Sequence, residues 1–138
     1  MVFGTSPGID TMKSLKLILI ALILIPISLR ADGFDDLMLA MKSGQAGGVT
    51  KFFNSNVELT LLDNEGIYSK LQAEQMLKNF FVQHPPKSVS IQHRGSSAQG
   101  AKYAIAIYES TNGKFRTYIF MKDNGNGLQV NEFRIERE

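Results

Sequence analysis

The side chains that could carry acid–base chemistry are few and widely spaced. The chain holds two histidines, His84 and His93, and no cysteine. His84 precedes Pro85-Pro86 at the predicted end of a helix. There it could lie near exposed backbone carbonyls, or it could act as a general base at the mouth of a pocket. Two histidines at this separation do not make a metal motif, which needs closer spacing or more ligands, so we predict no metal and no cofactor.

Two residues of predicted strands are candidates for catalysis. His93 follows the alternation of Val89 and Ile91, which predicts an inward-pointing imidazole. The alternative is a histidine near a strand end that reaches solvent. Glu109 follows the alternation of Tyr103, and a carboxylate held inside a pocket could act as a general base. Its place near the end of a strand favours exposure instead, and no catalytic residue is assigned.

Two arginines lie near the middle of the last two predicted strands. Arg116 and Arg134 could bind a carboxylate ligand through both guanidinium nitrogens. The alternative is that they form cross-strand pairs with Glu132 or Glu136 on an exposed face. Both interpretations remain open from the residues alone.

The N-terminal segment is predicted to be a targeting signal. Met12 is the expected start of a signal peptide at about residues 12–31, with an upstream extension before it. Its uncharged run, Leu17 to Leu29, has 13 residues and falls short of the roughly 20 that span a membrane. Cleavage is expected after Ala31, and an uncleaved anchor is the alternative. The remaining domain, residues 32–138, is therefore expected to be periplasmic or secreted and free of the membrane.

Export changes what the charge implies. The whole chain has 15 Lys and Arg against 13 Asp and Glu. Three of the basic residues (Lys13, Lys16 and Arg30) and one acid (Asp10) precede residue 32, which leaves 12 of each sign. A nucleic-acid partner would need a clustered basic excess, so none is expected. The lack of cysteine excludes disulfides, cysteine-bound zinc and thiol catalysis.

Helical spacing of apolar residues predicts the elements that must position these side chains. A first helix begins near Phe34 and ends at Gly44, and a short second stripe covers residues 49–53. A long third helix begins at Ser69 and Gln72, which have capping-box spacing, and ends before the two prolines.

Alternation and turn residues predict the strands. Residues 57–62 and 67–68 should pair across a turn at 63–66. After the prolines, four runs are predicted as an antiparallel meander with turns at Asn-Gly pairs; they cover about 88–95, 101–110, 114–122 and 128–136. One layer of helices must then cover one face of a bent sheet.

This order resembles the nuclear-transport-factor-2-like superfamily, the cone-shaped cystatin-like fold. The long helix with Phe80 and Phe81, ended by His84-Pro85-Pro86, and the hairpin around Asn112-Gly113 are similar to those of small exported bacterial proteins of unknown function. The resemblance implies an α+β domain with N-terminal helices packed on a strongly curved, mixed or antiparallel sheet, in the order α-α-β-β-α-β-β-β-β. It also implies a pocket between the helices and the concave sheet face.

The resemblance does not assign a function, because this fold supports isomerases, dehydratases, cyclases and binding modules. None of the isomerase motifs matches here. A small apolar ligand in the cone would contact Tyr103, His93 and Phe80. The favoured function is a non-catalytic module that binds a small ligand or a protein. The alternative is an isomerase or lyase that uses His93 or Glu109 in the cone, with Tyr103 as hydrogen-bond donor.

Both faces of the predicted meander are apolar. Grouped by odd and even numbers, one face carries Tyr103, Ile105, Ile107, Phe115, Ile119 and Met121, and the other carries Ala104, Ala106, Tyr108, Tyr118 and Phe120. A sheet with one wet face should alternate more cleanly. We therefore expect a self-association patch of Tyr108, Tyr118 and Phe120, which would form a homodimer through the sheet, as relatives in the superfamily often do. Aromatic rings that simply cover the sheet are the alternative.

Overall fold

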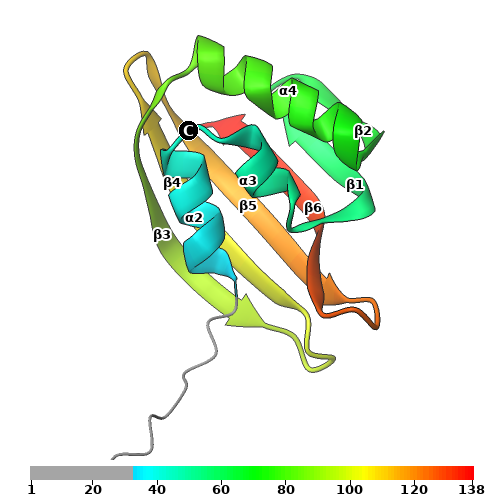
Figure 1. Cartoon of the computed structure of the whole chain (residues 1–138). Coiled ribbons are helices and arrows are strands. Elements are labelled where there is room, and N and C mark those ends of the chain that lie inside the picture. The colour runs from blue at the N-terminus through cyan, green and yellow to red at the C-terminus, as the bar shows by residue number, and fades with distance from the viewer. Residues whose placement is uncertain (1–32) are drawn as a thin grey trace, which may run out of the picture. The chain divides into compact units, whose positions relative to one another are not determined.

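The computed structural model describes residues 33–138. The predicted signal peptide and Asp32 lie outside this range. Three helices are described (Figure 1): α2 (Phe34–Lys42), α3 (Ala46–Thr50) and α4 (Lys70–Gln83). The strands are β1 (Phe53–Leu61), β2 (Asn64–Ser69), β3 (Pro86–Ser96), β4 (Lys102–Ser110), β5 (Gly113–Asp123) and β6 (Leu128–Arg137). No helix within the described range has the length and apolar character needed to cross a membrane.

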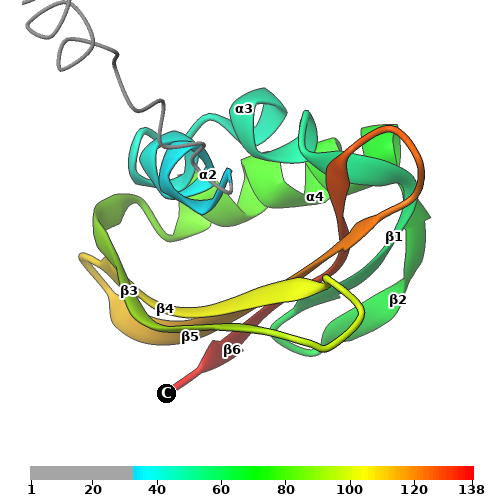
Figure 2. The ribbon, with the colours of Figure 1, turned by 90° about the horizontal axis from the view of Figure 1, so that it is seen from below.

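The strands form one six-stranded sheet in the order β2-β1-β6-β5-β4-β3. Strands β1 and β6 run parallel, and every other neighbouring pair is antiparallel. The sheet is bent, and all three helices lie on its concave side (Figure 2). The predicted α+β class and the predicted order of elements are confirmed.

Local sequence signals account for the helix ends. Asp35 and Asp36 stand in the first turn of α2, where negative charge complements the helix dipole. Gly44 follows the C-cap with a φ of 67°, a left-handed conformation that glycine adopts without steric cost. At the start of α4, the predicted capping box forms: Gln72 N donates to Ser69 Oγ over 3.2 Å, and Ser69 N donates to Gln72 Oε1 over 3.0 Å.

Two predicted boundaries near β1 are wrong. Phe53 was expected in the second helix, but it begins β1, where it pairs with Val130 of β6 and its ring lies 5.4 Å from that of Phe133. Strand β2 begins at Asn64, so the turn is shorter than the predicted 63–66. At Phe53, pairing with the distant strand β6 overrides local spacing, and at Asn64, pairing with Leu61 extends the local hairpin.

A β-bulge in β3 reverses the expected orientation of His93. Ile91 pairs with Ala106 and His93 pairs with Ile105, so Gln92 has no partner of its own. Such an extra residue shifts the alternation of the residues that follow. Ile91 therefore packs on the core, whereas His93 is exposed on the opposite face. The predicted inward imidazole is wrong.

The β4–β5 hairpin corrects the grouping of the sheet faces. Ser110 pairs with Gly113 across a two-residue loop, so Tyr108 lies opposite Phe115 and Tyr103 opposite Phe120. Residues with odd numbers in β4 thus share a face with even-numbered residues of β5. Tyr108 is fully buried under the helices, and its predicted place in a surface patch is wrong.

The concave side of the sheet is filled by the chain's own side chains. The largest fully buried ones come from every layer of the domain: Phe34, Leu37, Met41, Phe53, Leu59, Leu77, Tyr108, Phe115, Ile119, Met121, Phe133 and Ile135. Phe80 joins them, with its ring 5.5 Å from Tyr108 and 5.4 Å from Phe115. Among the described residues, an aromatic cluster thus occupies the space in which a ligand pocket was expected.

Candidate functional site

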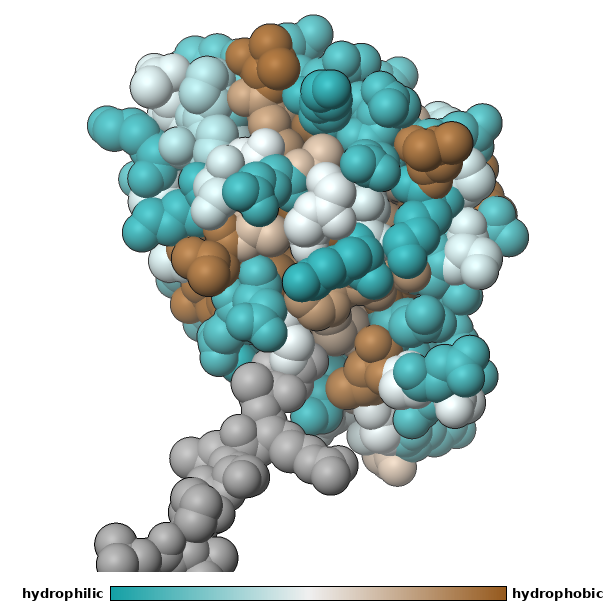
Figure 3. All heavy atoms as spheres, in the orientation of Figure 1, coloured by the Kyte–Doolittle hydropathy of each residue, from teal (hydrophilic) through white to brown (hydrophobic). Residues whose placement is uncertain are grey.

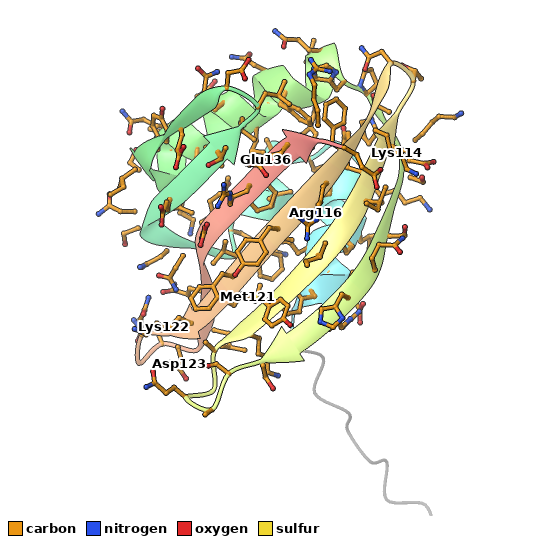
Figure 4. The ribbon with its side chains drawn as sticks, turned by 180° about the vertical axis from the view of Figure 1, so that it is seen from behind. Lys114, Arg116, Met121, Lys122, Asp123 and Glu136 are labelled. Carbon is orange, nitrogen blue, oxygen red and sulfur yellow. The ribbon has the colours of Figure 1, made fainter. Side chains whose placement is uncertain are left out.

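The face of the sheet opposite the helices carries a strip of apolar side chains. We call this set the outer strip; it consists of Tyr103, Ile105, Ile107, Tyr118 and Phe120. All five are only half-buried, although strand neighbours flank them. Figure 4 shows this face with no described element in front of it. The outer strip is therefore accessible from solvent across the centre of β4 and β5.

The ring of Tyr103 is held flat on the sheet by three neighbours. It crosses Gly95 of β3, where an added Cβ would lie 2.3 Å from the ring. Its hydroxyl lies 2.9 Å from Nε2 of His93, and its ring stacks on Tyr118 at 6.3 Å. A glycine opposite an aromatic residue allows this arrangement because the ring covers bare backbone. His93 and Tyr103, which were expected inside the cone, therefore form one unit on the outer face.

We expect Gly95→Ala to displace the Tyr103 ring with little effect on stability. The new methyl group would collide with the ring edge, and Tyr103 can rotate toward solvent to avoid it. Surface substitutions of this kind usually change stability by about 0.5 kcal/mol or less. The imidazole resonances of His93 should shift in NMR spectra as its contact with Tyr103 is lost. Ser96→Ala, an exposed neighbour, is the control; unchanged His93 resonances in Gly95→Ala would contradict this geometry.

A charged border lies beside the outer strip on β5 and β6. Arg134 binds two carboxylates of its own strand, Glu132 at 3.4 Å and Glu136 at 3.0 Å. The hydrogen bond to Glu136 raises the pKa of Arg134. Arg134 thus pairs with the two predicted carboxylates, but the predicted cross-strand geometry is wrong, because all three residues belong to β6. The side chain of Arg116 makes no ion pair or hydrogen bond with the described residues.

Arg116 and Tyr118 share a hollow of about 300 Å³ with Arg134 and Glu136. Figure 4 shows Arg116 on the exposed side of β5, next to Glu136 of β6. Burial, and then the charge of Glu132, raise the pKa of Tyr118, so its hydroxyl remains a hydrogen-bond donor at neutral pH. The guanidinium of Arg116 and the phenol of Tyr118, neither of which has a side-chain hydrogen bond to the described residues, can therefore donate to acceptor groups of a partner.

Glu109 lies at the end of β4, away from His93. It accepts a hydrogen bond from Ser88 Oγ at 3.2 Å and lies 3.9 Å from Nζ of Lys114. Ile105, the strand partner of His93, precedes Glu109 by four residues, which corresponds to about 13 Å along a strand. The two side chains cannot reach one ligand atom at that separation, and both are exposed rather than inside the cone.

His84 and Asn112 close the C-terminal end of α4. Asn112 Nδ2 donates to the carbonyl of Gln83 over 2.8 Å, and Asn112 Oδ1 lies 2.8 Å from Nδ1 of His84. Because the amide already donates to Gln83, its oxygen must accept, and His84 carries the proton on Nδ1. Tyr108 donates its hydroxyl to the carbonyl of His84. The interpretation of His84 as a helix-end residue is confirmed.

Sequence reasoning missed two of these positions. Asn112 was interpreted only as a turn residue, and no sequence signal indicates that its amide binds a helix end 29 residues earlier. Gly95 was interpreted as the end of a strand, although a glycine inside a strand pattern can mark a close approach of another group. Within residues 33–138, no three His, Asp or Glu side chains gather in a way that could hold a metal ion.

Comparison with known proteins identifies the family. Residues 34–136 match the family described as Domain of unknown function (DUF4783). A DUF4783 family protein from Bacteroides uniformis is 24% identical, with a TM-score of 0.70 over 75% of this chain and 95% of that chain. One from Bacteroides ovatus is 22% identical, with a TM-score of 0.70 over 75% of this chain and 93% of that chain.

A more distant structure defines the fold. A domain of unknown function with a cystatin-like fold from Nostoc punctiforme is 8% identical, with a TM-score of 0.62 over 76% of this chain and 72% of that chain. No curated protein matches the chain. The resemblance inferred from the order of elements is thus confirmed: the chain belongs to the DUF4783 family and has its cystatin-like fold.

Proposed function

We propose that this domain is an exported, non-catalytic module that binds a protein partner through the outer strip, and that one such partner is a second copy of the chain. The observation that carries this proposal is the contrast between the two faces of the sheet. The concave face is filled by buried aromatic side chains, whereas Tyr118, Phe120 and their neighbours are uncovered. Contiguous apolar surface of this kind is typical of protein-binding sites.

The helical side of the domain offers no comparable surface. Its exposed large hydrophobic residues include Leu39, Leu71 and Val82. Figure 3 shows this side, where hydrophobic atoms form separate spots among hydrophilic ones. Single exposed apolar residues are normal on soluble domains and need no partner. The outer strip is therefore the better candidate for an interface.

Charge on the outer face favours a second copy as the partner. The Arg116 side chain has no ionic partner among residues 33–138, and Glu136 lies opposite it in the β5–β6 register. In a two-fold dimer the same patch contributes from both chains, so each Arg116 can meet carboxylates of the other copy. Residues 32–138 carry equal numbers of positive and negative side chains, so net repulsion between copies is absent.

The other candidate functions have less support. A small apolar ligand inside the cone would have to displace the cluster of Phe80, Tyr108 and Phe115. An isomerase or lyase would need two titratable groups within reach of one ligand position. His93 and Glu109 are exposed and separated along the sheet, and no observation favours a catalytic role for them.

Native mass spectrometry of residues 32–138 tests the proposal. This unit can be studied alone, because its core lies within it and solved relatives consist of little more than the matched region. A dimer is expected at micromolar concentration, and Phe120→Ala should weaken it at least about tenfold, since central aromatic residues carry much of the energy of an interface. Leu71→Ala, which removes an exposed side chain from α4, should leave the dimer unchanged. A strictly monomeric wild-type domain would disprove self-association.

A further inference from the structure

A groove separates the β1–β2 turn from the second half of α4, on the far side of the sheet from the outer strip. Its volume is about 320 Å³, which is the lower end of the range for small-molecule sites. The base is apolar and includes Leu61, Met76 and Phe80. The rim is polar and consists of Asp63, Asn64, Asn79 and Gln83. The groove thus combines an apolar base with a ring of hydrogen-bonding groups from two elements.

The rim side chains are free to bind a ligand. None of the four makes a side-chain hydrogen bond or an ion pair with the described residues. The bond that Asn112 makes to Gln83 uses the backbone carbonyl of Gln83 and leaves its side-chain amide available. Each of the three amides both donates and accepts hydrogen bonds, whereas Asp63 only accepts. Among the residues that the structure describes, no lysine, arginine or histidine lines the groove. An anionic ligand would therefore meet a carboxylate and find no cation.

The wall of the groove is held in a costly backbone conformation. Leu62 has a φ of 55°, the only positive value among the described non-glycine residues. This left-handed conformation is strained for a residue with a Cβ. The backbone N–H of Leu62 donates to the carbonyl of Ile135 over 2.8 Å, and its side chain packs against the core. Pairing with β6 thus holds an apolar side chain at the groove, at a position where glycine would adopt the same φ without strain.

We propose that this groove binds a neutral polyhydroxyl compound about the size of one sugar ring. Adjacent hydroxyl groups each donate and accept hydrogen bonds, as do the amides of Asn64, Asn79 and Gln83. The C–H face of such a ring is apolar and matches Leu61 and Met76 at the base. The volume of about 320 Å³ matches a single ring better than a large cofactor, and Asp63 disfavours an acid. The groove acts independently of the outer strip.

An NMR titration of residues 32–138 tests this site. Glucose, galactose and N-acetylglucosamine are added separately up to about 50 mM, a concentration that fills most of a site whose dissociation constant is in the millimolar range. At least one sugar should shift the resonances of Leu62, Asn79 and Gln83. The double variant Asn79→Ala/Gln83→Ala should bind at least about tenfold more weakly. Gln75→Ala, which removes an exposed amide of α4 that does not line the groove, should bind normally.

A second variant separates the groove from folding. Leu62→Gly removes the apolar wall and its packing on the core, but it also relieves the strained φ. Because the two effects offset each other, the melting temperature should stay close to that of the wild type while sugar binding weakens. Phe120→Ala should bind sugar normally, which makes failure of this site distinguishable from failure of the outer strip. The proposal is overturned if none of the three sugars shifts these resonances. It is also overturned if ethanolamine or acetate shifts them instead, or if the double variant binds as tightly as the wild type.

Discussion

Phe115→Ala is expected to lower the free energy of unfolding by about 3–5 kcal/mol, the usual cost of removing a buried aromatic ring. The Phe115 ring is fully buried at the centre of the aromatic cluster, 5.4 Å from Phe80, 5.9 Å from Tyr108 and 4.8 Å from the imidazole of His84. Phe80 belongs to α4, Tyr108 to β4, and His84 follows α4, so the cavity cannot close by moving one side chain. The total stability of a small domain is about 5–15 kcal/mol, and much of it would be lost.

Urea unfolding followed by circular dichroism measures this loss, because the chain has no tryptophan to report by fluorescence. Phe120→Ala is a matched control from the same strand, since Phe120 points to the outer face and is only half-buried. Its expected cost is about 1 kcal/mol at protein concentrations too low for self-association. Phe115→Leu should fall between the two and keeps the test possible if the alanine variant does not fold. Equal losses for Phe115→Ala and Phe120→Ala would contradict the assignment of the two faces.

Tyr108→Phe is expected to lower the free energy of unfolding by about 1–3 kcal/mol. The ring of phenylalanine fills the same space, but the carbonyl of His84 loses the hydroxyl that donates to it. That carbonyl lies beyond the last turn of α4, where no further residue of the helix can donate to it. The same urea titration at neutral pH gives the difference. A variant as stable as the wild type would show that water replaces the hydroxyl.

The pH dependence of stability provides a second test of Tyr108. Burial raises the pKa of Tyr108 well above its ordinary value of about 10. Above that pH the unfolded chain loses the phenolic proton while the folded protein keeps it, so unfolding releases a proton and stability falls as the pH rises. Below about pH 10 the contribution is fully present. Tyr108→Phe lacks this term, so its stability should fall less steeply than that of the wild type above about pH 10.

Tyr118→Phe is the control for this measurement. The pKa of Tyr118 is also raised, chiefly by burial, so the wild-type domain contains two phenols whose proton release disfavours folding at high pH. Tyr118→Phe should retain the contribution of Tyr108 and should lose no hydrogen bond to α4. If Tyr108→Phe follows the wild-type pH profile, the hydroxyl of Tyr108 is not protected from ionisation in the folded domain.

The sequence predicted the strands but not all of the register between them, that is, which residues of neighbouring strands pair. Across a two-residue hairpin loop, each odd-numbered residue of one strand pairs with an even-numbered residue of the other, and paired residues share a face. The predicted Asn112-Gly113 turn therefore implies that the even-numbered Tyr108 and the odd-numbered Phe115 lie on the same face. Odd-numbered residues of β4 and odd-numbered residues of β5 therefore lie on opposite faces, as the turn itself predicts. The bulge at Gln92 is different, because no turn residue or break in alternation marks it. The orientation of His93 could not be obtained from its own strand.

The sequence by itself determined the order of elements, the capping box at Ser69 and the end of α2 at Gly44, because these depend on residues within one or two turns of each other. Only the tertiary structure decided that β6 lies beside β1, that Phe80 and Tyr108 fill the cone, and that Asn112 binds the end of α4. Those features depend on contacts between residues far apart in the chain. Local sequence does not indicate which of many possible distant partners each residue meets. The outer strip, the site around Arg116 and the groove at Leu62 also depend on strand register, so they can be located only in the folded structure.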